Sequence, residues 1–145
     1  MVYQAIMAYA VPRASSQQWE DRYVAATCIF LIIEGCKKFI RRDLEQLCQL
    51  IRPLLHDSVP VVCKKASYFF TEVSEYLGSA LTDVAPWLIQ DIGQMIVSQN
   101  AISIENGLVM LETIGIGYGR SHQDEMMNIC VYSFLSSCLI SSLLY

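Results

Sequence analysis

The residues that could perform acid–base or nucleophilic chemistry are few, and their spacing fits no common catalytic arrangement. Ser121, His122 and Asp124 place a hydroxyl, an imidazole and a carboxylate close together in the sequence. A catalytic triad needs these groups to converge in space from a rigid frame, whereas here they share one predicted turn. The spacings Cys-x-x-Cys, His-Glu-x-x-His and Gly-x-Ser-x-Gly do not occur. We therefore expect no enzymatic activity, no cofactor and no metal site.

A second group of residues has the chemistry of a binding surface. Glu34 and Glu75 are separated by a sequence interval of 41, and Glu72 and Tyr76 lie within one helical turn of Glu75. Both Glu34 and Glu75 follow a predicted core alanine by nine positions, which is about half a turn around a helix, so they point away from the core. These residues form either a solvated helix face or a surface that contacts a basic protein segment. Trp19 either stacks between repeats or anchors a partner.

The elements that carry these residues are predicted from the same sequence interval, which we call the repeat interval. Five apolar positions recur at the repeat interval in three segments, and their offsets of 0, 3, 4, 7 and 11 form one stripe on an α-helix. The three sets are Ala25, Cys28, Ile29, Ile32 and Cys36; Ala66, Phe69, Phe70, Val73 and Leu77; and Gly107, Met110, Leu111, Ile114 and Tyr118. An internal period of about 40 residues with helical stripes is typical of a helical solenoid.

The segments between the stripes recur at the repeat interval too, so each repeat is predicted to hold two helices, A and B. The matching pairs are Leu47 and Leu88, Ile51 and Ile92, Leu54 and Met95, and Leu55 and Ile96. We expect A helices over residues 43–55 and 83–98, with 2–10 as a possible first A helix, and B helices over residues 18–38, 61–77 and 103–117.

The predicted fold is all-α, a single α-solenoid of antiparallel helix pairs over residues 1–145. It has about three repeats plus partial ends, at residues 1–38, 43–77, 83–118 and 124–145. Because a helix with one apolar stripe cannot bury it alone, the stacked helices are expected to share a continuous core. Neither end carries a polar cap, which predicts a slice of a longer solenoid.

The overall charge limits the classes of partner. The chain has a net charge of −4, and no run of Lys or Arg exceeds two residues. Nucleic-acid binding needs a concentrated positive surface, so we expect basic protein segments rather than nucleic acid as partners. Two of the six cysteines, Cys28 and Cys36, fall on the predicted core stripe, which favours a reduced intracellular protein.

Residues 126–145 form an uncharged stretch that is long enough to cross a bilayer. The stretch also contains several serines, and no basic flank follows it. It is interpreted either as an orphaned solenoid helix or as a membrane anchor of a tethered adaptor. We expect the orphaned helix, and no membrane partner.

The motifs along the chain resemble HEAT repeats, and among HEAT proteins they most resemble the importin-β (karyopherin-β) family. The stretch Trp19-Glu-Asp-Arg-Tyr-Val-Ala-Ala26, continuing to Ile33-Glu-Gly-Cys36, is similar to that family's helix B. Residues 50–57, Leu-Ile-Arg-Pro-Leu-Leu-His-Asp, resemble the end of helix A and the aspartate turn of a HEAT unit. The sequence departs from HEAT units, which usually have Val-Arg at the start of helix B, because it has Val62-Cys63. The arginine that would bond to a neighbouring turn aspartate is therefore missing at this position.

The resemblance implies a protein-binding segment of a nuclear transport receptor, found in the cytoplasm and the nucleus. Its B helices would bind basic cargo on a concave face through Trp19, Glu34, Glu72, Glu75 and Tyr76. Phe-Gly nucleoporins would dock between the A helices, and Ran would release the cargo in a complete receptor. The alternative is a structural HEAT scaffold of a multiprotein complex, of the type found in type 2A phosphatases.

Overall fold

The chain folds into α-helices throughout the residues that its computed structural model describes, which are 2–81, 84–98 and 100–119. The α-helices of this part are α1 (Val2–Ala10), α2 (Trp19–Leu31), α3 (Lys37–Arg42), α4 (Leu44–Ile51), α5 (Pro60–Leu77), α6 (Ala85–Ile96) and α7 (Ala101–Gly119). Three short 3₁₀ helices join them: η1 (Val11–Arg13), η2 (Arg52–His56) and η3 (Gly78–Leu81). The predicted all-α fold class is confirmed for this part of the chain.

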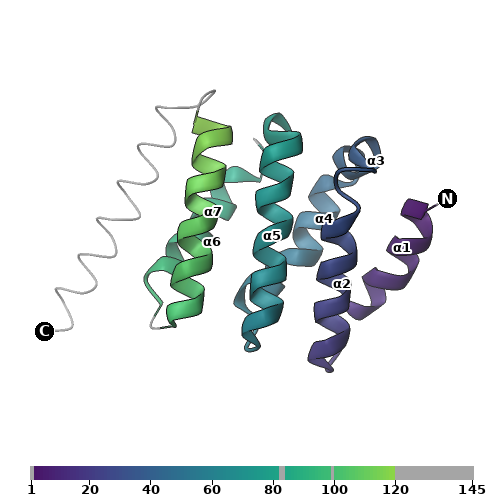
Figure 1. The fold of residues 1–145 in the computed structure, drawn as a ribbon, viewed down its shortest axis with the longest axis horizontal. Coiled ribbons are helices and arrows are strands. Elements are labelled where there is room, and N and C mark those ends of the chain that lie inside the picture. The colour runs from purple at the N-terminus through teal and green to yellow at the C-terminus, as the bar shows by residue number, and fades with distance from the viewer. Residues whose placement is uncertain (1, 82–83, 99, 120–145) are drawn as a thin grey trace, which may run out of the picture.

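The longest helices stand side by side in one row. Figure 1 shows α2, α5 and α7 next to one another, with α4 and α6 behind them and α1 beside α2 at the N-terminal edge. Helix α5 packs against both α2 and α7, and α6 packs against α7. The row contains the three predicted B helices, and the helices behind it are the predicted A helices.

Most predicted helix boundaries are confirmed to within two residues. Helices α1, α5, α6 and α7 match the predicted segments, and the predicted A helix over 43–55 is present as α4 continued by η2. Pro53 lies at the start of η2, where its missing N–H and its ring do not fit a continuing α-helix. Pro60 occupies the first turn of α5, where no backbone donor is needed.

One predicted boundary is wrong. The B helix expected over 18–38 ends at Leu31, and α3 follows after a turn. In this turn the side chains of Ile32 and Ile33 are buried in the core. Isoleucine is also not among the strongest helix formers, so the helix ends here at little cost. Gly35 follows them, and glycine has the lowest helix propensity after proline. Glu34 therefore lies in a turn rather than on a helix.

The predicted stripes form the core between the helices. Ala25, Ala66, Phe69, Phe70 and Met110 are completely inaccessible to solvent. Ile29, Ile32, Val73, Leu77 and Ile114 are buried too, and Cys28, Cys36 and Leu111 are partly buried against the same core. Each stripe begins with a small residue, which allows a close approach at Gly107, where an added Cβ would lie 3.1 Å from Met95 Cβ and 3.3 Å from Ile96 N.

Two ion pairs connect successive helix pairs. The Arg22 guanidinium on α2 donates to both carboxylate oxygens of Asp57 before α5, at 2.6 and 2.9 Å. Arg52 donates to both oxygens of Asp91 on α6 in the same way, at 2.7 and 3.0 Å. HEAT units usually have this arginine at the position that Cys63 occupies here. The Asp57 carboxylate instead accepts its hydrogen bonds from Arg22, which precedes Cys63 by the repeat interval.

We predict that Arg22→Met lowers the free energy of unfolding by about 2 kcal/mol, because it leaves the Asp57 carboxylate without its charged donor. Only 5 % of the Asp57 side chain is exposed, so water replaces that donor poorly. Arg13→Met is the control: Arg13 lies 3.8 Å from Asp21, and both side chains are about a third exposed or more. The control should cost less than about 1 kcal/mol. Equal losses in urea unfolding of the two variants would contradict this account.

We also predict opposite effects for two glycine substitutions. Gly107→Ala should lower the free energy of unfolding by about 1 kcal/mol, because the new Cβ contacts atoms of α6 that move only with their backbone. Gly78→Ala should raise it by about 0.4 to 1 kcal/mol, because nothing lies within 4 Å and the backbone is already helical. Thermal and urea unfolding measure both, and a stabilised Gly107→Ala would refute the close approach of α6 and α7.

Candidate functional site

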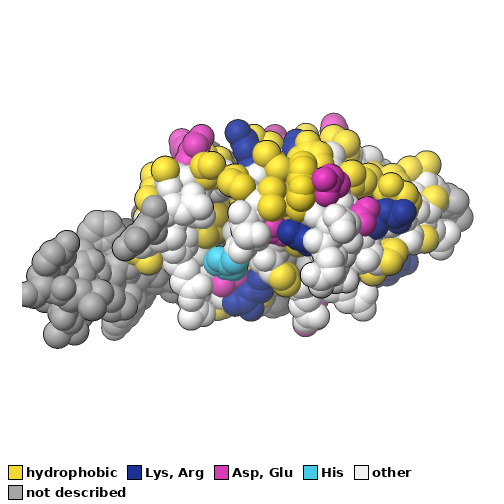
Figure 2. All heavy atoms as spheres, turned by 90° about the horizontal axis from the view of Figure 1, so that it is seen from below, with side chains coloured by type: hydrophobic (Ala, Val, Ile, Leu, Met, Phe, Trp, Pro, Cys, Tyr) yellow, Lys and Arg dark blue, Asp and Glu magenta, His cyan; other side chains and the backbone are white. Residues whose placement is uncertain are grey.

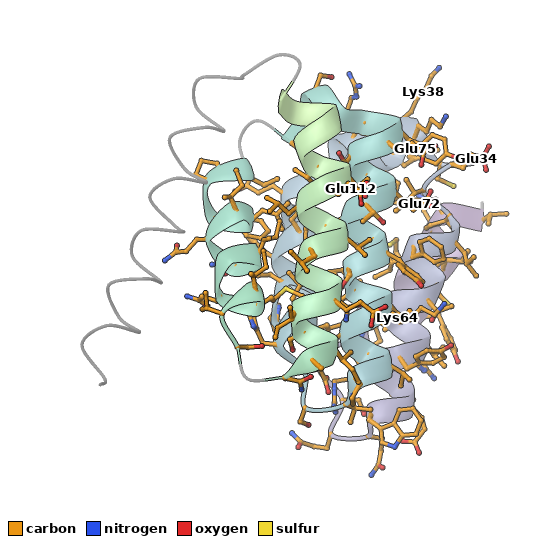
Figure 3. All side chains as sticks on the ribbon, turned by 60° about the vertical axis from the view of Figure 1, so that its left-hand side comes forward. Glu34, Lys38, Lys64, Glu72, Glu75 and Glu112 are labelled. Atoms are coloured by element: carbon orange, nitrogen blue, oxygen red, sulfur yellow. The ribbon has the colours of Figure 1, made fainter. Side chains whose placement is uncertain are left out.

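Three carboxylates lie near the C-terminal ends of α2 and α5. They belong to Glu34, Glu72 and Glu75, which we call the acidic patch. Glu72 and Glu75 are one turn apart on α5, on the side opposite to buried Val73 and Ser74. Glu34 comes from the turn after α2, which places it beside the C-terminal part of α5. Figure 3 shows the three side chains together at this end. The structure thus brings together the three glutamates that the sequence selected.

The carboxylates are close enough to affect one another's protonation. The pKa of Glu72 is raised, first by partial burial and then by the negative charges of Glu75 and Glu34. The pKa of the Tyr76 hydroxyl is also raised, mainly by Glu34, with smaller effects of burial, Glu75 and Glu72. Because a like charge disfavours ionisation, these shifts indicate a local negative potential that a bound cation would relieve.

Lys37 and Lys38 lie near the acidic patch without forming ion pairs to it. Lys37 of α3 places its Nζ 4.2 Å from the centre of the Tyr76 ring, as a cation–π contact. Lys38 lies at the rim of the patch in Figure 3. None of the ion pairs within the described residues includes Glu34, Glu72 or Glu75. The patch therefore keeps three carboxylates available to a partner.

The helix row extends the negative surface onto α7. Glu112 is exposed and lies on the same side of the row as Glu72 (Figure 3). Sequence reasoning missed Glu112 because its distance from Glu72 along the chain is one position short of the repeat interval. A search for acidic residues near the interval, rather than at it, would have found it.

An aromatic cluster lies one helical turn from the acidic patch and was not predicted. Tyr23, Phe30 and Tyr68 surround the Lys65 ammonium, whose Nζ is 5.9, 5.6 and 5.2 Å from the three ring centres. The rings come from α2 and α5, so this cation–π contact stabilises the junction between the two helices. Tyr68 precedes Glu72 by four positions on α5, which places its partly buried ring one helical turn from that carboxylate.

Trp19 does not belong to the acidic patch. It opens α2 and is 41 % exposed, whereas the patch lies beyond the other end of this helix. Figure 2 views the end of the row at which α2 begins and shows hydrophobic side chains gathered there. Val61 and Ile102, in the first turns of α5 and α7, are also exposed. Trp19 and the three glutamates therefore lie at opposite ends of α2, and partner binding by Trp19 stays a prediction.

Several predicted features lie outside the described residues. These are the Ser121, His122 and Asp124 group, the partial repeat over 124–145 and the uncharged stretch 126–145. Within residues 2–81, 84–98 and 100–119, no helix is both long enough and apolar enough to span a membrane. The same residues contain no group of three or more His, Cys, Asp or Glu side chains placed to hold a metal ion.

Comparisons of the chain with protein-family models, with curated proteins and with solved structures find no match.

We predict that Glu75→Gln lowers the pKa of Glu72, because it removes one of the negative charges that raise it. The shift should be partial, since burial is the largest cause and Glu34 remains. Titration of the side-chain carboxyl carbons by NMR measures the change. Glu45→Gln on α4 is the control and should leave the pKa of Glu72 unchanged. If the pKa of Glu72 is also unchanged in Glu75→Gln, the carboxylates do not interact.

Proposed function

We propose that the chain is a protein-binding segment of an α-solenoid of HEAT type, similar to the importin-β family. Support comes from the repeat interval, from the row of B helices with A helices behind it, and from the Arg22–Asp57 pair at the aspartate turn. Successive B helices then present one continuous face, and this face carries the acidic patch. In the complete receptor, nucleoporins and Ran would bind other surfaces.

The acidic patch is the observation that carries the proposal. Its three carboxylates form no ion pair within the described residues, and the pKa of Glu72 is raised. Such a group binds a basic peptide favourably because the cations of the peptide reduce the mutual repulsion of the carboxylates. The partly buried ring of Tyr68, one turn before Glu72 on α5, provides apolar contact for the methylene groups of lysine or arginine side chains. The partner is therefore a basic protein segment, such as the localisation signal of a cargo.

Neutralising two carboxylates of the acidic patch tests this function. The double variant Glu34→Gln/Glu75→Gln should bind a fluorescent nonapeptide of alternating lysine and glycine about three- to tenfold more weakly, because two exposed ion pairs are lost. Glu20→Gln/Glu45→Gln removes the same charge elsewhere and should bind like the unmodified chain. Fluorescence anisotropy at low salt measures both affinities. Equal weakening by the two variants would mean that only net charge matters, and would contradict a specific site.

A second candidate is a structural scaffold of the phosphatase type, which the two bidentate ion pairs between successive helix pairs favour. Such contacts suit a frame that holds partners in fixed positions. Affinity capture from cell extract distinguishes the candidates: nucleoporins and Ran would support the transport receptor, whereas a stable phosphatase or ligase complex would support the scaffold.

A further inference from the structure

Helix α7 has a second apolar stripe beside the one that it buries in the core. Its members are three and four positions apart, as on one side of an α-helix, and we call them the outer stripe: Ala101, Ile104, Leu108 and Leu111. Leu108 is 51 % exposed, and Ile104 and Leu111 are only partly buried. A surface helix normally has one apolar stripe, which faces the core. The outer stripe therefore indicates a second neighbour of α7.

The same position is buried in α2 and α5, where the next helix of the row covers it. Leu108 follows Ser67 of α5 by the repeat interval, and Ser67 follows Ala26 of α2 by the same interval; both are buried. Ser74, two turns after Ser67 on the same side of α5, donates to the Thr113 carbonyl of α7 at 3.4 Å. That side of α5 thus faces α7, and the outer stripe is the corresponding side of α7.

The chain beyond α7 contains a segment whose chemistry suits this surface. Residues 126–145, which lie outside the described residues, carry no charge, and only residues 120–125 separate them from Gly119 at the end of α7. Connections of this length join helices that pack side by side. The tether also gives the segment an effective concentration on the order of millimolar at the outer stripe.

The spacing within this segment predicts which of its sides is buried. Apolar residues recur at helical offsets of 0, 3, 4, 7 and 8, the pattern of a helix with one buried side, at Val131, Phe134, Leu135, Cys138 and Leu139. Three serines fall on the opposite side: Ser133, Ser136 and Ser137. They follow core residues of α6 by the repeat interval, namely Ile92, Met95 and Ile96. A further A helix in the register of α6 would therefore turn serines toward the core.

We propose that residues 126–145 pack as a helix on the outer stripe of α7, with Phe134 and Leu135 toward Leu108 and Ser137 toward solvent. The segment then presents a different side to the row than α6 does. It covers the apolar surface of α7 and leaves serines on the outside, where a bilayer would favour apolar residues. This inference depends on the helix row and not on the partner proposed for the acidic patch.

Hydrogen exchange of the whole chain, read by mass spectrometry, tests which side of the segment is buried. Amides of residues 126–145 should exchange at least about tenfold more slowly than in the free peptide of the same sequence. Leu135→Asp should abolish this protection, whereas Ser137→Asp, on the opposite side, should leave it unchanged. Equal loss in both variants, loss in Ser137→Asp alone, or no protection in the unmodified chain would overturn the proposal.

A substitution on α7 tests the surface itself. Leu108→Asp should remove the protection of residues 126–145, whereas Val61→Asp should not; Val61 is the matched control because it is 46 % exposed in the first turn of α5. Slow exchange in α5 reports that the row stays folded, and Leu135→Asp decides the matter if Leu108→Asp unfolds it. Full protection in Leu108→Asp would contradict the proposal. So would retention of the unmodified chain in membranes after carbonate washing, which would show that a bilayer covers the segment.

Discussion

Burial of one apolar stripe per long helix is the constraint on which the rest of the structure depends. A helix with a single stripe cannot shield it from water, so α2, α5 and α7 must pack against one another and against the helices behind them. Small residues such as Ala66 and Gly107 begin these stripes, and an added Cβ at Gly107 would press against α6. Each fully buried large side chain contributes roughly 1.5 to 3 kcal/mol, which far exceeds the contribution of a surface ion pair. The row is therefore set by apolar packing, and the ion pairs at Asp57 and Asp91 reinforce the junctions.

The same packing buries Val73 and Ser74 of α5 and leaves the opposite side of this helix, with Glu72 and Glu75, toward solvent. Glu34 and Glu75 are exposed, so water screens much of their repulsion. Glu72 is partly buried, and its raised pKa reflects both that burial and its neighbours. The acidic patch therefore destabilises the folded chain only slightly and still attracts a cation. We propose that this balance is the basis of partner binding by the acidic patch.

Much of the fold follows from the sequence, because hydrophobic spacing specifies both the helices and their buried faces. The boundaries of α5 and α7 follow from the repeat interval, whereas Glu34 lies near Glu75 from a turn and not from the helix that the interval predicts. The early end of α2 does not follow from the sequence pattern, because the burial of Ile32 and Ile33 in a turn depends on the core around them. The ion pair between Arg22 and Asp57 joins residues far apart in the sequence, so it follows no helical spacing. A pocket lined by Met7 of α1 and Leu47 of α4 arises from three-dimensional packing, which no pattern in the sequence specifies.

The central claim is that successive helix pairs are related by the same translation, and a distance measurement tests it most directly. Positions 20, 61 and 102 are separated by the repeat interval and are exposed in the first turns of α2, α5 and α7. Spin labels at these positions report the separations by electron paramagnetic resonance. Since packed helices lie about 8 to 10 Å apart, the separation of 20 and 102 should be about twice that of 20 and 61. Equal separations for all three pairs would indicate a closed bundle and contradict the repeat architecture.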